Sequence, residues 1–135
     1  MKRLIACALF ATTAGGGMLA AGNAQTPQLA MLDKLQTGSW VLRYRNDARA
    51  NERICLSNGR QLIQLRHDQK NCRRAIVGDS ALQVTVQYTC PGHGYGRTDI
   101  RRESNQLVQI DSQGIKDGVP FAFTAEARRV GSCRN

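Results

Sequence analysis

Cysteines and histidines are the residues of this chain whose chemistry is most specific. Cys55, Cys72, Cys90 and Cys133 follow an N-terminal apolar segment that contains a fifth cysteine, Cys7. If that segment is an export signal, as argued below, the four remaining cysteines predict a disulfide framework. Of the possible pairings we favour Cys55–Cys72 with Cys90–Cys133, because each bond would close a self-contained piece of chain. A zinc site is disfavoured, since its cysteines usually come in closely spaced pairs and these lie at least 17 positions apart.

Two histidines, His67 and His93, are the other candidates for chemistry. His93 follows Cys90 at a C-x-x-H spacing that also occurs in metal sites, but a cysteine in a disulfide has no thiolate to offer. The segment from Pro91 to Gly96 holds three glycines and a proline, which predicts a loop. We therefore expect no metal or other cofactor. We predict that His93 and Tyr95 are presented to a partner, because loops on rigid scaffolds often carry binding residues.

The sequence holds no motif that indicates catalysis. No G-x-S-x-G occurs, and two histidines offer few bases for a nucleophilic triad. The glycines around His93 lead into a predicted strand, whereas phosphate-binding loops lead into a helix. Spacing alone leaves open a carboxylate pair for glycoside cleavage, yet Asp99 is expected to form an ion pair with Arg97 or Arg101 on one strand face. A protein without enzymatic activity is therefore favoured.

The charge of the chain is strongly positive. It carries 19 Lys and Arg against 10 Asp and Glu, a net charge of +9. Loss of Lys2 and Arg3 with a signal peptide would leave +7, with 14 arginines among the remaining 17 basic residues. Arginine binds carboxylates and phosphates in a bidentate way, so an anionic envelope component or an acidic protein is the partner we expect. The alternative is that the arginines form an ordinary solvated surface, and export argues against nucleic acid.

The first 24 residues are predicted to be a cleaved secretory signal. Met1 to Arg3 is positively charged, the next 18 residues are apolar or small, and Gly22-Asn23-Ala24 supplies small residues before a cleavage site. Three glycines, Gly15 to Gly17, weaken the segment as a membrane anchor, so we expect no integral membrane span after cleavage. A lipoprotein box ending at Cys7 would leave a signal core of only three residues. The protein is therefore expected in the periplasm or outside the cell.

Cleavage would leave 111 of the 135 residues, which is the size of one domain. Residues 25–37 are predicted to be a leader or a short helix, because Leu29, Leu32 and Leu35 recur at every third position. Residues 38–135 are predicted to form a single disulfide-stapled β domain.

From Gly38 onward, alternation of apolar and polar residues predicts strands. In the first strand Trp40, Leu42 and Tyr44 share one face, and Arg43 and Arg45 lie on the other. The clearest strand runs over 81–90, with Leu82, Val84, Val86, Tyr88 and Cys90 on its apolar face. Further strands are expected over 73–77, 97–102, 106–110 and 119–130, with an Asp117-Gly118 turn before the last. A helix capped by Ser57 and carrying Leu62, Ile63 and Leu65 is expected before them.

These elements together predict a mainly β fold. Hairpin spacing and one-sided alternation favour a curled antiparallel meander of about six strands, either a half-barrel or a small closed barrel. One or two short helices and two disulfides complete the expected domain.

The ordered set of short motifs along the chain resembles a known family. These motifs are Gly38-Ser39-Trp40, Ile54-Cys55-Leu56, the mid-chain cysteines and the Glu-Ala-Arg-x-x-Gly-x-Cys sequence ending at Cys133. The chain is similar over roughly Gly38 to Cys133 to the domain of unknown function 3617 family of small exported proteobacterial proteins. The resemblance implies a periplasmic setting and implies no activity, ligand or catalytic residue.

Three functions remain open at this point. The first is a non-enzymatic binding or interaction module of the envelope, in which Arg43, Arg45, Arg97 and Arg101 on the polar sheet face meet anionic groups. The second is a carrier of a small apolar ligand held inside the curled sheet. The third is an inhibitor of a secreted hydrolase, a role open to small disulfide-braced β domains.

Overall fold

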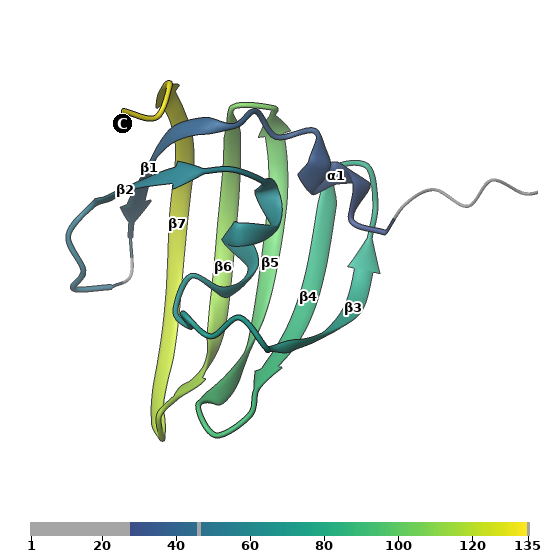
Figure 1. Ribbon diagram of the computed structural model, residues 1–135, viewed down its shortest axis with the longest axis vertical. Coiled ribbons are helices and arrows are strands. Elements are labelled where there is room, and N and C mark those ends of the chain that lie inside the picture. The colour runs from purple at the N-terminus through teal and green to yellow at the C-terminus, as the bar shows by residue number, and fades with distance from the viewer. Residues whose placement is uncertain (1–27, 46, 135) are drawn as a thin grey trace, which may run out of the picture.

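The computed structural model describes residues 28–45 and 47–134, and the predicted signal segment lies outside these residues. One antiparallel sheet contains seven strands in the order β2-β1-β7-β6-β5-β4-β3. The strands are β1 Gly38–Tyr44, β2 Glu52–Leu56, β3 Arg73–Asp79, β4 Gln83–Cys90, β5 Gly94–Ser104, β6 Leu107–Lys116 and β7 Val119–Gly131. The sheet is curled but not closed (Figure 1), which confirms the predicted mainly β curled meander.

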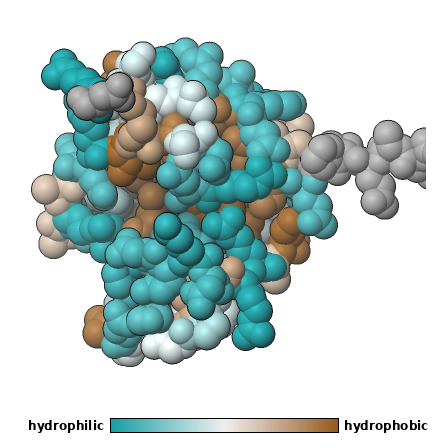
Figure 2. Space-filling model, in the orientation of Figure 1, coloured by the Kyte–Doolittle hydropathy of each residue, from teal (hydrophilic) through white to brown (hydrophobic). Residues whose placement is uncertain are grey.

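Two short helices lie on the concave face of the sheet (Figure 1). They are α1, Ala30–Asp33, and the 3-10 helix η1, Gly59–Gln64. Strands β2 and β3 form opposite edges of the sheet, so residues 57–72, which connect them, must cross from one edge to the other. We call these residues the crossing segment. Seen from this side in Figure 2, it presents mostly hydrophilic residues, with hydrophobic ones visible between them.

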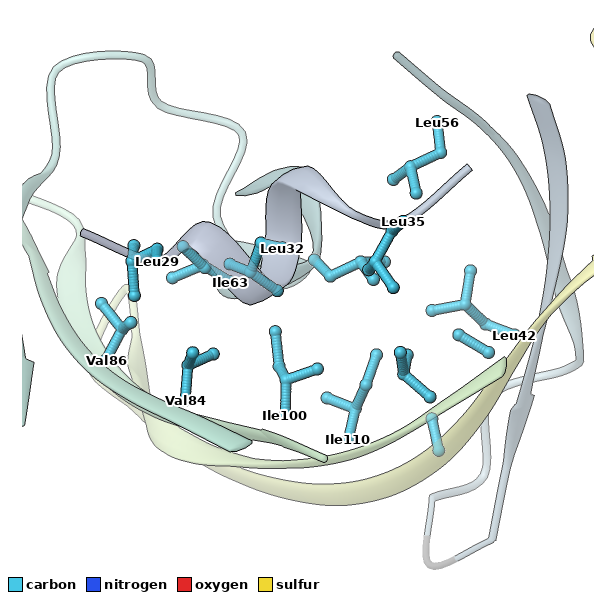
Figure 3. Close-up of a cluster of buried hydrophobic side chains, with 14 of the residues drawn as sticks. Leu29, Leu32, Leu35, Leu42, Leu56, Ile63, Val84, Val86, Ile100 and Ile110 are labelled. Atoms are coloured by element: carbon cyan, nitrogen blue, oxygen red, sulfur yellow. The ribbon is translucent and has the colours of Figure 1, made fainter. Parts of the chain in front are cut away.

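The core lies between the helices and the concave face. In Figure 3, Leu29, Leu32 and Leu35 and the η1 residue Ile63 lie over apolar side chains of the sheet, among them Val84, Val86, Ile100 and Ile110. Leu32, Val84, Val86 and Ile100 are completely buried. The leucines that predicted a helix in the leader are therefore part of the core, and residues 29–35 belong to the same packed unit as the strands.

The alternation predicted for 81–90 is confirmed in β4. Val84, Val86, Tyr88 and Cys90 are buried, whereas Gln83, Gln87 and Thr89 are exposed. Leu82 is 59% exposed, so its predicted place in the core is wrong: it precedes β4 and lies in the turn from β3. The Asp117-Gly118 turn is confirmed, and both residues adopt the positive φ angles that such a tight hairpin requires, 49° and 82°.

Two features of the strands were predicted incompletely. The sheet has seven strands rather than about six, because β2 was not expected. Its exposed Glu52 and Arg53 hide the alternation, and its pairing with β1 is what makes it a strand. Strands β5 and β6 are longer than predicted. Residues 94–96, which were predicted to belong to a loop because of their glycines, pair with β4 and β6 and begin β5. The inward-facing positions of β5 and β6 also include Thr98 and Ser112, which interrupt the apolar alternation. These two buried hydroxyls lie 2.8 Å apart, and Thr98 also donates to the carbonyl of Ile63 at 2.6 Å.

The N-terminal cap of η1 differs from the expectation. Asn58, not Ser57, is the cap residue: its side chain accepts from the backbone N–H of Arg60 at 3.0 Å, and its own N–H donates to Gln61 Oε1 at 3.1 Å. Ser57 instead donates both its N–H and its hydroxyl to the same Gln61 oxygen. Either residue type can cap a helix, so composition did not distinguish them.

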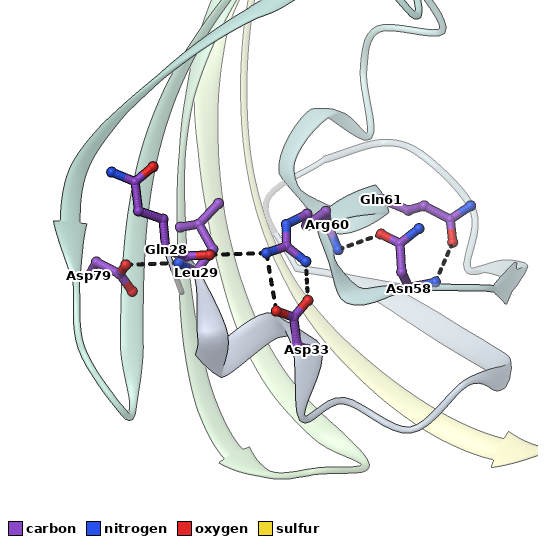
Figure 4. A network of polar contacts seen from close by, with 7 residues as sticks. All are labelled: Gln28, Leu29, Asp33, Asn58, Arg60, Gln61 and Asp79. Atoms are coloured by element: carbon purple, nitrogen blue, oxygen red, sulfur yellow. Dashed lines mark hydrogen bonds and ion pairs between the residues drawn. The ribbon is translucent and has the colours of Figure 1, made fainter. Parts of the chain in front are cut away.

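A polar network fastens α1 to its neighbours (Figure 4). Arg60 in η1 forms a two-pronged ion pair with Asp33 and donates to the carbonyl of Gln28 at 3.0 Å. The backbone N–H of Leu29 donates to Asp79 Oδ2 in β3 at 2.8 Å. The N-terminal helix is therefore held both by its leucines and by polar contacts to two other elements.

The predicted disulfide pairing is wrong. The bonds are Cys55–Cys133 and Cys72–Cys90. Sheet register explains both, because Cys55 and Gly131 each lie opposite Ser39 of β1, which brings Cys133 beside Cys55. Likewise, Arg73 lies opposite Thr89, so Cys72 and Cys90 face each other at the ends of β3 and β4. The expected bond across the helix is therefore replaced by two bonds between strand ends.

Candidate functional site

The polar residues singled out in the sequence lie on the convex face of the sheet, the side away from the helices. Cross-strand pairing arranges the outward side chains in rows. From β4 across β5, β6 and β7, three of these rows are Thr89, Tyr95, Ile115, Pro120; Gln87, Arg97, Gln113, Ala122; and Thr85, Asp99, Asp111, Thr124. A fourth is Gln83, Arg101, Gln109 and Glu126, and it continues to Arg43 in β1.

The four predicted arginines are thereby brought to one face. Arg97 and Arg101 come from β5, and Arg43 lies on β1, opposite Glu126 of β7. Arg45 follows β1 directly, and its backbone N–H donates to the carbonyl of Thr124 at 2.9 Å. All four side chains are exposed, so each guanidinium is accessible from solvent.

These arginines differ in their partners. Arg45 donates to Gln109 Oε1 at 3.1 Å and lies 3.8 Å from Glu126, and Arg101 lies 3.2 Å from Glu103. Such exposed pairs contribute little to stability and are easily exchanged. Among the described residues, Arg43 and Arg97 form no ion pair or side-chain hydrogen bond. They therefore offer the most available cationic groups of the face.

The expected ion pair of Asp99 with Arg97 or Arg101 is absent from the described part of the chain. Asp99 instead accepts hydrogen bonds from Thr85 Oγ1 at 2.5 Å and from Gln83 Nε2 at 2.7 Å. Both donors come from β4, the neighbouring strand. The carboxylate is thus satisfied across the sheet rather than along its own strand. Arg101 pairs with Glu103 instead, and Arg97 has no carboxylate partner among the described residues.

Three open hollows lie side by side on the convex face, and neighbouring hollows have lining residues in common. One of about 340 Å³ is lined by residues that include Tyr95, and it shares Arg97 and Gln113 with a central hollow of about 380 Å³. The central hollow shares Asp111 and Thr124 with a third, of about 320 Å³, which reaches Arg45 and Arg101. We call the three together the convex trough.

His93 lies at the end of the molecule where Tyr95 lies, in the turn between β4 and β5. Its Nδ1 is 3.1 Å from Asp117 Oδ1, and its carbonyl accepts from the N–H of Asp117 at 2.9 Å. These contacts join two neighbouring hairpin turns. Tyr95, two residues later, lies on the convex face and is 48% exposed, so the ring of Tyr95 is available to a partner.

His67, the other histidine considered from the sequence, is a buried structural residue. It is 2% exposed, with Nδ1 3.0 Å from the Tyr88 hydroxyl and Nε2 3.2 Å from the carbonyl of His93. A carbonyl only accepts, so Nε2 carries the proton and Nδ1 accepts from Tyr88. Burial raises the pKa of Tyr88 to about 12, which keeps this hydroxyl protonated as a donor. His67 thus anchors the crossing segment to the sheet.

Replacing His67 with leucine is expected to lower the free energy of unfolding by about 2 kcal/mol, because two buried polar groups lose their partner. Urea denaturation followed by circular dichroism measures the loss. Tyr88→Phe removes one of the two partners, so the double variant should cost less than the sum of the single changes. Full additivity would show that the contact between the two side chains contributes nothing.

Within residues 28–45 and 47–134, no three His, Cys, Asp or Glu side chains come together as metal ligands. No helix among these residues is long and apolar enough to span a membrane.

Comparison with known proteins found no matching family model, curated protein or solved structure. The resemblance to the domain of unknown function 3617 family therefore stays a prediction.

Proposed function

We propose that this protein is a non-enzymatic, exported binding module whose convex face binds an anionic component of the cell envelope. The observation that carries the proposal is the gathering of Arg43, Arg45, Arg97 and Arg101 on one exposed sheet face. Arginine pairs bidentately with carboxylates and phosphates, and several exposed arginines on one face suit a partner with repeated negative charges.

The cysteines support a compartment outside the cytoplasm. The two disulfides join strand ends across sequence separations of 78 and 18 residues, and such bonds persist in oxidising environments. The periplasm is the compartment that fits both these bonds and the predicted signal over residues 1–24.

The packing of the concave face favours a binding surface over an internal carrier. A carrier would need a cavity beside Val84, Val86 and Phe121. Val84 and Val86 are completely buried, and α1 and η1 fill the concave face above them. The exposed arginines on the opposite face therefore offer the better supported site.

Binding to anionic envelope material tests the proposal. The mature protein is expected to co-sediment with lipopolysaccharide and with phosphatidylglycerol vesicles at about 20 mM salt, and to be released at about 500 mM salt, where charges are screened. Neutral phosphatidylcholine vesicles should not bind it.

Charge-matched variants show whether the convex face is responsible. A triple variant, Arg43→Gln, Arg97→Gln and Arg101→Gln, is expected to bind at least about tenfold more weakly. The control replaces Lys34, Lys70 and Arg134, which are exposed elsewhere, by glutamine and removes the same charge. Equal losses in the two variants, or no low-salt binding of the unmodified protein, would contradict the proposal.

A further inference from the structure

We infer that the convex trough binds a linear acidic polysaccharide, with its sugar rings lying along β5 and β6. This inference rests on the proposed function and specifies the kind of anionic partner. Four observations carry it: the shape of the trough, the mixture of polar groups in it, an exposed tyrosine at one end and the spacing of its arginines.

The shape of the trough suits an extended polymer. Its three hollows are open and lie next to one another, with lining residues in common, whereas sites for small molecules usually enclose most of their ligand. Tyr95 and Arg101 lie six residues apart on β5, which corresponds to about 20 Å of strand. That length accommodates a run of several sugar units.

The polar groups in the trough include both acceptors and donors. Asp99 and Asp111 lie directly opposite each other on β5 and β6, and Gln87, Gln109 and Gln113 add amides that both donate and accept. Sugar hydroxyls can satisfy both kinds of group at once. Phosphate groups alone would pair with the arginines and leave the carboxylates and amides without partners, so this mixture favours a ligand that carries hydroxyl groups as well as negative charge.

The facing carboxylates form an arrangement that costs stability without a ligand. Like charges directly opposite each other on neighbouring strands are destabilising. Asp99 is satisfied by Thr85 and Gln83, but Asp111 forms no hydrogen bond or ion pair within the described residues. A hydroxyl group placed between the two would donate to Asp111 and partly offset the repulsion, so Asp111 is the acceptor that we assign to a sugar hydroxyl.

Tyr95 supplies a surface for the apolar face of a sugar ring. It is 48% exposed and shares its row with Ile115 and Pro120. An exposed aromatic ring with an apolar surround and polar neighbours can bind an amphipathic partner. Pyranose rings are such partners, since they carry C–H groups on their faces and hydroxyls on their edges.

The arginines on either side of the carboxylates are the groups that would bind the acidic groups of the ligand. Arg97 lies between Tyr95 and Asp99 on the same strand face, and Arg101 lies four residues further along, about 13 Å away. Each guanidinium can hold one sugar carboxylate in a bidentate pair. The trough therefore alternates cationic positions with hydroxyl acceptors, as a polymer of sugar acids requires.

Binding of a defined oligogalacturonate tests the inference, with two comparison ligands, one that lacks the negative charge and one that lacks the sugar rings. The methyl-esterified oligomer keeps the sugar backbone and loses the charge, whereas a polyphosphate keeps the charge and has no hydroxyl groups on rings. We expect calorimetric binding to oligogalacturonate and weaker binding to both comparison ligands, because each lacks one of the two features that the trough recognises. Amide shifts on titration should concentrate at Tyr95, Arg97 and Gln113.

Variants with matched controls locate the site. Tyr95→Ala is expected to weaken oligogalacturonate binding by about fivefold or more, whereas Leu82→Ala, which also truncates an exposed hydrophobic residue, should leave it unchanged. Arg97→Gln should weaken binding more than Arg134→Gln does. Because all four side chains are exposed, these changes leave the packed core intact.

The outcomes distinguish this inference from the proposed function. Polyphosphate binding as tight as oligogalacturonate binding, or equal affinities of the Tyr95→Ala and Leu82→Ala variants, would overturn the polysaccharide assignment and leave a general anion-binding face. The polysaccharide assignment would also be overturned if oligogalacturonate did not bind while lipopolysaccharide or phosphatidylglycerol still did. Failure of all anionic ligands would overturn the proposed function as well.

Discussion

Replacing Cys72 and Cys90 together with serine is expected to lower the free energy of unfolding by about 3 kcal/mol, the loop-closure contribution of a bond across 18 residues. Cys90 is 1% exposed, so the new hydroxyl at this position adds a buried polar group and makes the loss larger. Urea denaturation of the oxidised protein and of the double variant measures the difference. An unchanged unfolding midpoint would contradict the assigned role of this bond.

The second disulfide provides the matched comparison. Cys55 is exposed, whereas Cys90 is buried, so a limiting amount of dithiothreitol is expected to reduce Cys55–Cys133 first. Alkylation and mass spectrometry identify the freed thiols, and a non-reduced digest shows the pairing directly. Early alkylation of Cys90 would contradict the different accessibility of the two bonds.

Replacing Leu32 with alanine is expected to cost about 3 kcal/mol or more of unfolding free energy, because the side chain is completely buried and its removal leaves a cavity. The size of this effect follows from the place of α1, which lies on the concave face with Leu29 and Leu35 beside Leu32 (Figure 3). Chemical denaturation monitored by the fluorescence of Trp40, the single tryptophan, measures it.

Lys34→Ala is the control for this change. Lys34 is exposed and lies next to the same helix, so its truncation should alter the unfolding free energy by less than about 0.5 kcal/mol. Similar small effects of both variants would show that the helix is not an essential part of the core. A large effect of Leu32→Ala alone would establish that α1, which lies within the predicted leader, is integral to the domain.

The strands were predictable where one face of each is apolar throughout. Val84, Val86 and Tyr88 alternate with polar residues over β4, and this local pattern was sufficient to place both the strand and its buried face. Strand β2 lacked such a pattern, because an edge strand exposes most of its side chains. Thr98 and Ser112 also broke the pattern, since they are buried by hydrogen bonding to each other rather than by being apolar.

The arginines of the candidate site could be predicted from the sequence, but their positions relative to one another on the sheet could not. Alternation put Arg43 and Arg45 on the polar side of one strand, and Arg97 and Arg101 on the polar side of another. Their common face depends on strand order, because β7 and β6 lie between β1 and β5. The partners of Asp99 were missed for the same reason, since Thr85 and Gln83 reach it from β4.

Local properties of the chain were thus enough to predict a small, basic, mainly β domain with two disulfides. Apolar alternation can be recognised within a few residues, and the number of cysteines needs no knowledge of which residues meet. The cysteine partners, the place of β2 and the shared arginine face depend instead on contacts between distant residues. Cys55 meets Cys133 because β1 pairs with both β2 and β7. Such pairing is decided by which strands bury the most apolar surface together, and no single stretch of the chain contains that information.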